Sequence, residues 1–321
     1  MDKTIHNQAY LLATHGSLWA MDRARLEGYA ATMVVDTLAP EQIEQRTGPR
    51  GFAYYDEQGT LEDRSAGPVR STRRAIAVLP LLGPISQRAG LMTALFGGSS
   101  TERFGRMLDE TAADASVGAI VLEVDSPGGS VAGVPELAVK VAAAKAKKPV
   151  VAVANGMMAS AAYWIGSQAS ELVVTPSGEV GSIGVWSMHT DLSEALAKEG
   201  VKVTLISAGP HKTELNPYEP PSLEALEYEQ QQVDRYYGEF VDAVADGRRK
   251  TAATVRKEMG GGRLVGPKAA LAAGMADRVA TIETTIRRLG GRLAEQDRAA
   301  AEAERRRVIL ERMEREDRIN E

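Results

Sequence analysis

The sequence predicts an α/β protein built around a mainly parallel sheet. Apolar strand-like runs alternate with helical segments of about ten residues through the middle of the chain, a pattern typical of βαβ crossovers. The runs are almost continuously apolar, as expected for strands that are covered on both faces. With 321 residues, 44% of them hydrophobic and 25% charged, the chain is long enough for one large or two ordinary domains with a full core.

The order of the elements follows from hydrophobic periodicity. The predicted strands are 75–81, 119–124, 150–154, 171–175 and 201–206. The predicted helices between them are 101–113, 134–147, 160–169 and 192–199. Further on, 223–248 is expected to form one long helix, and 267–273 a short helix that stops at Gly274.

Both ends of the chain differ from this middle part. Residues 18–35 have a helical apolar rhythm, whereas 46–71 are polar and rich in glycine and charge, which predicts a loop or linker. The last thirty residues are dominated by Ala, Glu and Arg and predict a charged helix or a partly disordered tail. We therefore expect an N-terminal extension and linker (1–72), a main domain (73–290) and a charged tail (291–321).

Composition excludes several classes of function. A net charge of −5 gives no sign of nucleic-acid binding, and the absence of cysteine excludes thiol catalysis, disulfides and zinc–thiolate sites. No secretory signal is expected, because the first residues lack a basic start followed by an apolar core. The uncharged stretch 149–170 has the length of a membrane span. Polar residues such as Asn155 and Gln168 interrupt it, so we interpret it as a buried strand followed by a buried helix.

The most informative stretch of the sequence runs from Asp125-Ser-Pro-Gly-Gly129 to Ala159-Ser-Ala-Ala-Tyr163. Two glycines after a strand leave backbone N–H groups free to face a developing oxyanion. A serine flanked by alanines is expected at the start of a helix, with its hydroxyl uncrowded. Acyl transfer needs both features, so the sequence predicts a serine hydrolase. Asp125 and Ser126 are expected to shape the turn rather than to act in catalysis.

Ser160 needs a base, because a free hydroxyl is a weak nucleophile. One option is Lys212, whose amine acts as a base only if its pKa is lowered towards the working pH. Another is His189, which has Asp191 close by and would complete a Ser–His–Asp triad. The residues alone leave both options open, although Thr190 or Asp191 is also expected to cap a helix.

Five motifs, in order, resemble peptidase family S49, which contains the signal peptide peptidase A proteins and the phage prohead (capsid maturation) proteases. They are DSPGG (125–129), MASAAYW (158–164), GSIGV (181–185), HKTELNP (211–217) and GGRLVGPKAALAAGMAD (261–277). The resemblance runs from about residue 75 to 280. It implies a fold similar to the Clp protease/crotonase spiral of ββα units.

The resemblance also implies the roles of individual residues. The nucleophile falls on Ser160, the general-base lysine on Lys212, and the serine that hydrogen-bonds this lysine on Ser182. The oxyanion donors fall on the backbone at Gly128 and Gly129. No metal or organic cofactor is implied.

The branch of the family follows from what surrounds these motifs. The sequence predicts no N-terminal membrane segment like that of the signal peptide peptidases, and its HKxxxNP motif is similar to that of phage head-maturation proteases. This implies a serine endopeptidase in the cytoplasm of a bacterial host, inside an assembling prohead, that cleaves scaffold, capsid or portal proteins and forms a homo-oligomer. Neither nucleic acid nor membrane is an expected partner. The alternatives are a cytoplasmic peptidase with the same dyad and an inactive prohead scaffold component.

Overall fold

The computed structural model describes residues 19–21, 53–62, 74–88 and 98–320, and its centre is a nine-stranded sheet. Three parallel neighbours form the middle of this sheet: β4 (Ala75–Leu82), β7 (Val117–Ser126) and β9 (Val150–Ala159). The other strands are β2 (Ala53–Tyr55), β3 (Leu61–Glu62), β10 (Glu171–Val174), β11 (Glu179–Gly181), β12 (Leu264–Val265) and β13 (Arg278–Val279). Their order is β12-β11-β9-β7-β4-β2-β3, and β10 lies between β9 and β13. The predicted α/β fold with a mainly parallel sheet is confirmed.

A second, four-stranded sheet lies beside the carboxyl end of β7. It consists of β1 (Trp19–Met21), β8 (Gly128–Ser130), β5 (Ile85–Ser86) and β6 (Ser99–Ser100), in that order. Strand β8 follows β7 directly, so the glycine pair that the sequence singles out lies inside this small sheet. Its neighbours are β5, which is parallel to it, and β1, which is antiparallel.

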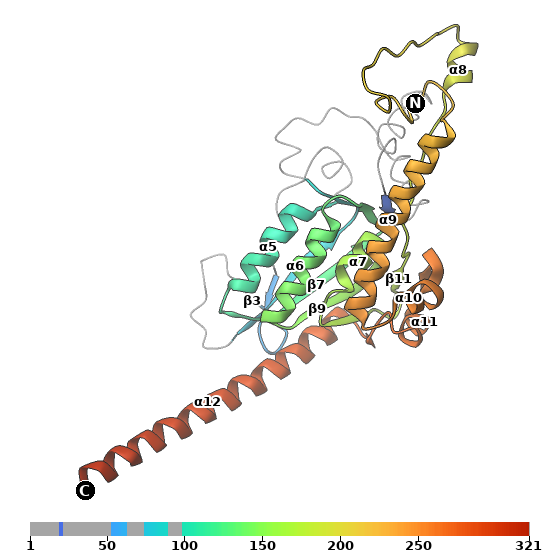
Figure 1. The fold of residues 1–321 in the computed structure, drawn as a ribbon. Coiled ribbons are helices and arrows are strands. Elements are labelled where there is room, and N and C mark those ends of the chain that lie inside the picture. The colour runs from blue at the N-terminus through green and yellow to red at the C-terminus, as the bar shows by residue number, and fades with distance from the viewer. Residues whose placement is uncertain (1–18, 22–52, 63–73, 89–97, 321) are drawn as a thin grey trace.

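Alternate side chains of the central strands enter two separate cores, as the period of a strand requires. On one face, residues such as Leu79 and Leu122 pack under four helices (Figure 1). These helices are α5 (Thr101–Ala113), α6 (Val134–Lys147), α7 (Ala161–Gly166) and α9 (Leu223–Arg248). On the other face, Val78 and Val121 share a core with Leu289 of α12 (Ile282–Asn320). Both faces are covered, which explains the nearly continuous apolar strands.

Two parts of the chain extend away from this body (Figure 1). The outer part of α12 projects into solvent, with residues 300–315 all exposed. Residues 186–222, which we call the arm, include α8 (Ser193–Lys198) and lie at the N-terminal end of α9. The remaining helices, α10 (Ala252–Glu258) and α11 (Pro267–Ala272), are short. In the described part of the chain, no helix is both long and apolar enough to span a membrane.

Three local predictions from the sequence are wrong. Residues 201–206 form no strand but lie exposed on the arm, because a β-prone segment needs a neighbouring strand edge to pair with. Part of the predicted linker 46–71 is a hairpin, in which β2 and β3 pair and β2 extends the sheet next to β4. Residues 19–21 form a strand rather than the start of a helix, and the rest of 18–35 lies outside the described residues.

Candidate active site

Three of the five motifs, those that contain the glycine pair, Ser160 and Ser182, meet at the carboxyl ends of adjacent parallel strands. Strands β7, β9 and β11 are neighbours in this order, and they lead into the glycine segment, Ser160 and Ser182, respectively. Ligands of open α/β sheets bind at this edge. Ser160 therefore lies between the proposed oxyanion donors on one side and Ser182 on the other.

Ser160 has an unusual backbone conformation at the junction of β9 and α7. Its φ is 52° and its ψ −118°, a combination outside the usual regions for a residue with a side chain. The Ser160 N–H donates to Gly181 O at 2.7 Å, and Trp164 N–H donates to Ser160 O as the helix begins. The hydroxyl Oγ lies 3.5 Å from Gly184 O, a long hydrogen bond, and the residue is 1% exposed. Non-glycine residues in such conformations cluster at functional sites.

Ser182 occupies the matching position on the next strand. Ala159 of β9 pairs with Gly181 of β11, and each of these residues is followed by one of the two serines. Ser182 also has a positive φ, 54°, and its N–H donates to Arg263 O at 2.9 Å. A β-carbon at Gly181 would lie 2.8 Å from that same carbonyl, so the close approach of β12 requires glycine there. Strand β12 therefore fixes the backbone that presents Ser182.

The glycine segment is held by Ser126, which confirms that this serine shapes the turn. Ser126 Oγ donates to Gly83 O at 2.6 Å and accepts the Gly128 N–H at 3.2 Å. A β-carbon at Gly129 would lie 1.8 Å from Ile85 O, so only glycine fits beside β5. Both predicted oxyanion donors are thus on β8, next to α7. In this structure the Gly128 N–H is engaged by the Ser126 hydroxyl.

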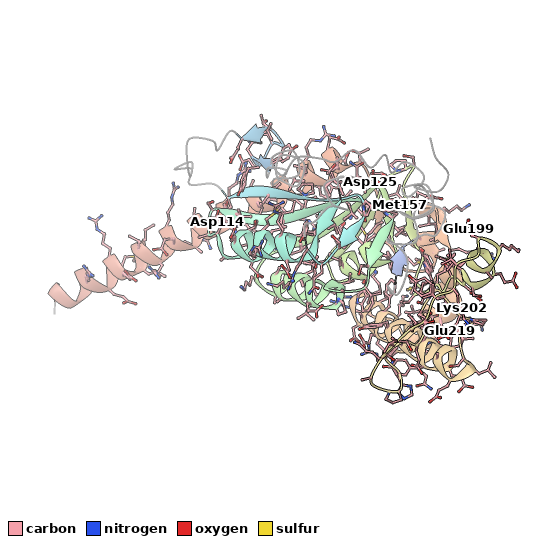
Figure 2. The ribbon with its side chains drawn as sticks, turned by 90° about the horizontal axis from the view of Figure 1, so that it is seen from above. Asp114, Asp125, Met157, Glu199, Lys202 and Glu219 are labelled. Carbon is pink, nitrogen blue, oxygen red and sulfur yellow. The ribbon has the colours of Figure 1, made fainter. Side chains whose placement is uncertain are left out.

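Asp125 ties β7 to the bend in β9 just before the nucleophile. Its Oδ1 accepts the Met157 N–H at 3.1 Å, and Figure 2 shows the two residues side by side. Gly156 has a φ of 116°, and a β-carbon there would lie 2.8 Å from Asp125 Oδ1. The sequence predicts that Asp125 shapes its own turn; its contact with the neighbouring strand is not part of that prediction. The Asn155-Gly156 pair within an apolar run is the signal that marks the bend.

Helix α7 is anchored from behind by aromatic residues. The rings of Trp164 and Phe240 are stacked, with centroids 4.7 Å apart and an angle of 9° between their planes. The Tyr163 hydroxyl donates to Met275 O at 3.0 Å, and burial raises the pKa of this phenol. The residues that follow Ser160 are therefore fixed by packing against α9 and by a hydrogen bond to the segment after α11.

Lys212 lies on the arm and makes no hydrogen bond with Ser160. It lines a groove of about 860 Å³ between residues 185–189, residues 212–217 and the first turns of α9. Lys212 itself is exposed, and Figures 1 and 2 both show the arm at one extremity of the molecule. Its neighbour His211 bonds Glu214 through Nδ1 at 2.7 Å, and this carboxylate raises the pKa of His211. The structure thus brings Ser160 and Ser182 together without bringing Lys212 into contact with them.

The structure does not assemble the alternative triad either. His189 lines the same groove as Lys212, whereas the Ser160 hydroxyl faces Gly184 O. Asp191 Oδ1 accepts the Ser193 N–H at 2.8 Å, and the hydrogen bonds to Ser193 lower the pKa of Asp191. This carboxylate therefore closes a local turn just before α8. The N-cap of α8 is Leu192, which makes no side-chain capping bond, so the predicted cap at Thr190 or Asp191 is not the one observed. Among the described residues, no three His, Asp or Glu side chains converge in a way that would hold a metal ion.

The chain is similar to several known proteins. Residues 142–296, which contain Ser160, Ser182 and Lys212, match the model of peptidase family S49. The head-tail preconnector protein of Enterobacteria phage P21 is 34% identical over 206 residues, and the capsid assembly protease C of Escherichia phage lambda is 37% identical over 163 residues. A candidate protease of Synechocystis sp. is 31% identical over 221 residues.

These matches cover different shares of the proteins compared. The alignments span 64% and 51% of this chain but only 41% and 36% of the two phage proteins, respectively. The match to the cyanobacterial protein spans 66% of this chain and 72% of that protein. The sequence similarity therefore covers most of the cyanobacterial protein. The chain spans less than half the length of each of the two phage proteins.

Proposed function

The chain belongs to peptidase family S49, and we propose that it is a serine endopeptidase in which Ser160 attacks the peptide bond and Lys212 acts as general base. The observation that carries this proposal is the position of Ser160. It begins a helix at the carboxyl edge of the sheet, in a strained conformation, between the glycine segment and Ser182. A serine with a purely structural role does not require this conformation.

The proposed chemistry uses these groups in sequence. A neutral Lys212 accepts the Ser160 proton as the hydroxyl attacks, and it then returns the proton to the leaving amine. Ser182 orients the lysine amine by a hydrogen bond. The backbone N–H groups of Gly128 and Gly129 stabilise the tetrahedral oxyanion, where a single donor is typically worth about 3 kcal/mol of barrier height. The Gly128 N–H, which donates to the neutral Ser126 hydroxyl in this structure, would bind the charged oxyanion more strongly.

We propose that Lys212 reaches Ser160 across the junction between two copies of the chain. Lys212 is exposed on the arm, which projects from the body. The same arm exposes a group of apolar side chains that a lone chain leaves in water: Val201, Val203, Leu205, Ile206 and Tyr218. Clustered exposed apolar residues mark protein interfaces. A neighbouring copy that covers the arm would also receive its lysine.

The proposed substrates are structural proteins of a phage head. The support is the likeness to a capsid assembly protease and a head-tail preconnector protein, together with the HKxxxNP form of the lysine motif. In this proposal the protease clips scaffold, capsid or portal protein during head maturation.

A direct test incubates the purified chain with candidate capsid and scaffold proteins and identifies the products by mass spectrometry. We expect defined cuts with the unaltered chain and none with Ser160→Ala or Lys212→Met. Ser177→Ala and Lys147→Met are matched controls, because both residues are exposed and Lys147, at the end of α6, lies outside the arm. Equal cleavage by the unaltered chain and Ser160→Ala would refute the nucleophile. A folded chain that cuts none of these proteins would favour the scaffold alternative.

The shared site has its own test, in which two inactive variants are mixed. Ser160→Ala and Lys212→Met subunits are unfolded together and refolded as a mixture. If each site takes its serine and lysine from different copies, about one quarter of the sites in a 1:1 mixture receive both groups. Recovery of about a quarter of the original activity supports the shared site. No recovery in a mixture that still co-assembles shows that both groups act within one chain.

A further inference from the structure

Strand β8 has two different neighbours, and one of them comes from a distant part of the chain. On one side Gly129 pairs with Ile85 of β5. On the other side the three residues of β8 pair antiparallel with Trp19, Ala20 and Met21 of β1 (short dark-blue strand in Figure 1). Without β1, the backbone of Gly128–Ser130 would be an open strand edge.

We propose that β1 is an intramolecular blocking strand, which occupies the edge of β8 where an extended peptide substrate binds. This inference rests on the proposed peptidase function and adds the regulation of that same site. Extended peptides bind proteins by adding a strand to an open sheet edge. The edge in question belongs to the strand that carries the two proposed oxyanion donors.

The position of β8 relative to the nucleophile supports this assignment. Ser126 of β7 pairs with Met158 of β9, two residues before Ser160, and β8 begins two residues after Ser126. Helix α7, which starts directly after Ser160, packs against β8. A peptide paired with the outer edge of β8 would therefore run past the nucleophile. A segment of the chain that already occupies this edge excludes it.

The composition of the edge defines the class of ligand. Gly128 and Gly129 contribute only backbone, so the edge recognises N–H and C=O groups of an extended chain rather than particular side chains. The expected ligand is an unfolded or flexible protein segment. This fits β1 itself, which is only three residues long and pairs with a single strand. A strand this short is held weakly enough to be displaced.

The test measures peptide binding in a Ser160→Ala background, where no hydrolysis is needed. Hydrogen-bonded and non-bonded pairs alternate in an antiparallel ladder, so replacing both Ala20 and Met21 by proline must remove a donor that faces β8. The control Ala20→Gly with Met21→Ala removes the same side chains but keeps both N–H groups. The probe is a fluorescent peptide with the sequence of residues 17–23, Ser-Leu-Trp-Ala-Met-Asp-Arg. The same peptide, N-methylated at Ala and Met, is the negative probe.

We expect the double-proline chain to bind the peptide about tenfold more tightly than the glycine/alanine control, because the competing strand no longer occupies the edge. The N-methylated peptide should bind neither chain. Equal affinities of the two folded chains, or binding of the N-methylated peptide as strongly as the parent, would overturn the proposal. If Ser160 proves not to be a nucleophile, this binding result stands by itself.

A second measurement applies if the double-proline chain does not fold. Excess peptide is added to the Ser160→Ala chain, and hydrogen exchange is followed by mass spectrometry. Displacement predicts faster exchange in residues 19–21, while Gly128–Ser130 stay protected by the incoming peptide. Unchanged exchange in residues 19–21 at saturating peptide would refute the blocking strand. With the active serine present, the double-proline chain should also degrade unfolded casein several-fold faster, through a lower KM.

Discussion

Ser160 and Ser182 lie side by side because the residues before them, Ala159 and Gly181, pair with each other on neighbouring parallel strands. Both have φ values above 50°, although neither is glycine. Two adjacent non-glycine residues in this region are rare, and the surrounding backbone must hold them there. Gly181 O accepts the Ser160 N–H, so the strand that presents one serine also fixes the other.

This arrangement predicts that Ser182→Ala impairs catalysis without unfolding the chain. Under the proposed mechanism, the substitution removes a hydrogen bond to the lysine amine that is worth about 1.5–3 kcal/mol, so kcat should fall about 10- to 100-fold. KM should change little, because Ser182 does not bind the substrate. Steady-state kinetics on a cleaved peptide measures both constants.

The control for this experiment is Ser177→Ala, an exposed serine in the turn before β11. It should leave kcat unchanged. Full activity of Ser182→Ala would remove this residue from the mechanism and leave it with a structural role in the turn. Thermal unfolding of each variant distinguishes lost chemistry from lost structure.

A second prediction compares two glycines beside the site. Gly129→Ala would place a β-carbon 1.8 Å from Ile85 O, whereas a β-carbon at Gly184 meets nothing within 4 Å. Gly129→Ala should therefore destabilise the chain by about 1–3 kcal/mol and abolish cleavage. Gly184→Ala should leave stability unchanged. Urea unfolding and casein degradation test both variants, and equal stability of the two would contradict the close approach of β5 and β8.

The sequence predicted the parts of this structure that depend on local pattern. The bounds of helices α5, α6 and α9 coincide with the predicted 101–113, 134–147 and 223–248. The glycine segment and Ser160 each follow a predicted apolar strand, and they meet because parallel strands end at the same edge of the sheet. These features are set by periodicity and connectivity, and both can be read directly from the residues.

Long-range pairing could not be predicted in the same way. The contact between β1 and β8 joins segments more than a hundred residues apart, and three residues carry no periodicity. Residues 201–206 have the composition of a strand but pair with no strand in the described part of the chain, so propensity alone gave the wrong structure. The place of Lys212 depends on how the arm is oriented, which no local pattern fixes.

A third prediction concerns the pH dependence of stability. Arg248 and Asp277 form a two-pronged ion pair at 2.6 and 2.9 Å, and Asp277 also accepts the Leu172 N–H. Burial opposes the charged carboxylate, but these hydrogen bonds hold the pKa of Asp277 below its usual value. A carboxylate with a lowered folded-state pKa stabilises the fold above about pH 4, and this contribution is lost as pH falls through the folded-state value.

We therefore expect Asp277→Asn to lower the free energy of unfolding by about 1–2 kcal/mol at pH 7, since the carboxylate is 41% exposed and partly screened. The difference from the unaltered chain should shrink as the pH is lowered from 5 to 3. Urea unfolding across this range measures it. Glu302→Gln, in an exposed pair with Arg306, should change stability by less than about 0.5 kcal/mol. A difference that does not depend on pH would refute this role of the pair.

A fourth prediction separates the two halves of α12. Its first turns carry Ile286, Leu289 and Leu293 into the core under the sheet, and Arg74 bonds Asp297 at 2.6 Å. Beyond these contacts, residues 300–315 are exposed. Leu289→Ala should therefore cost about 2–4 kcal/mol. Deletion of residues 300–321 should change the free energy of unfolding by no more than about 0.5 kcal/mol in dilute solution.

The comparison should be repeated at several protein concentrations. If the outer helix stabilises only its own domain, the change in Tm caused by the deletion does not depend on concentration. If the deletion lowers Tm at high but not at low concentration, the outer helix contacts another copy of the chain. If it lowers Tm equally at every concentration, the outer helix packs on its own domain, and the exposed arrangement of residues 300–315 is wrong. An unchanged Tm throughout confirms that the fold of the domain is complete by Asp297 and that the outer helix is free for another role.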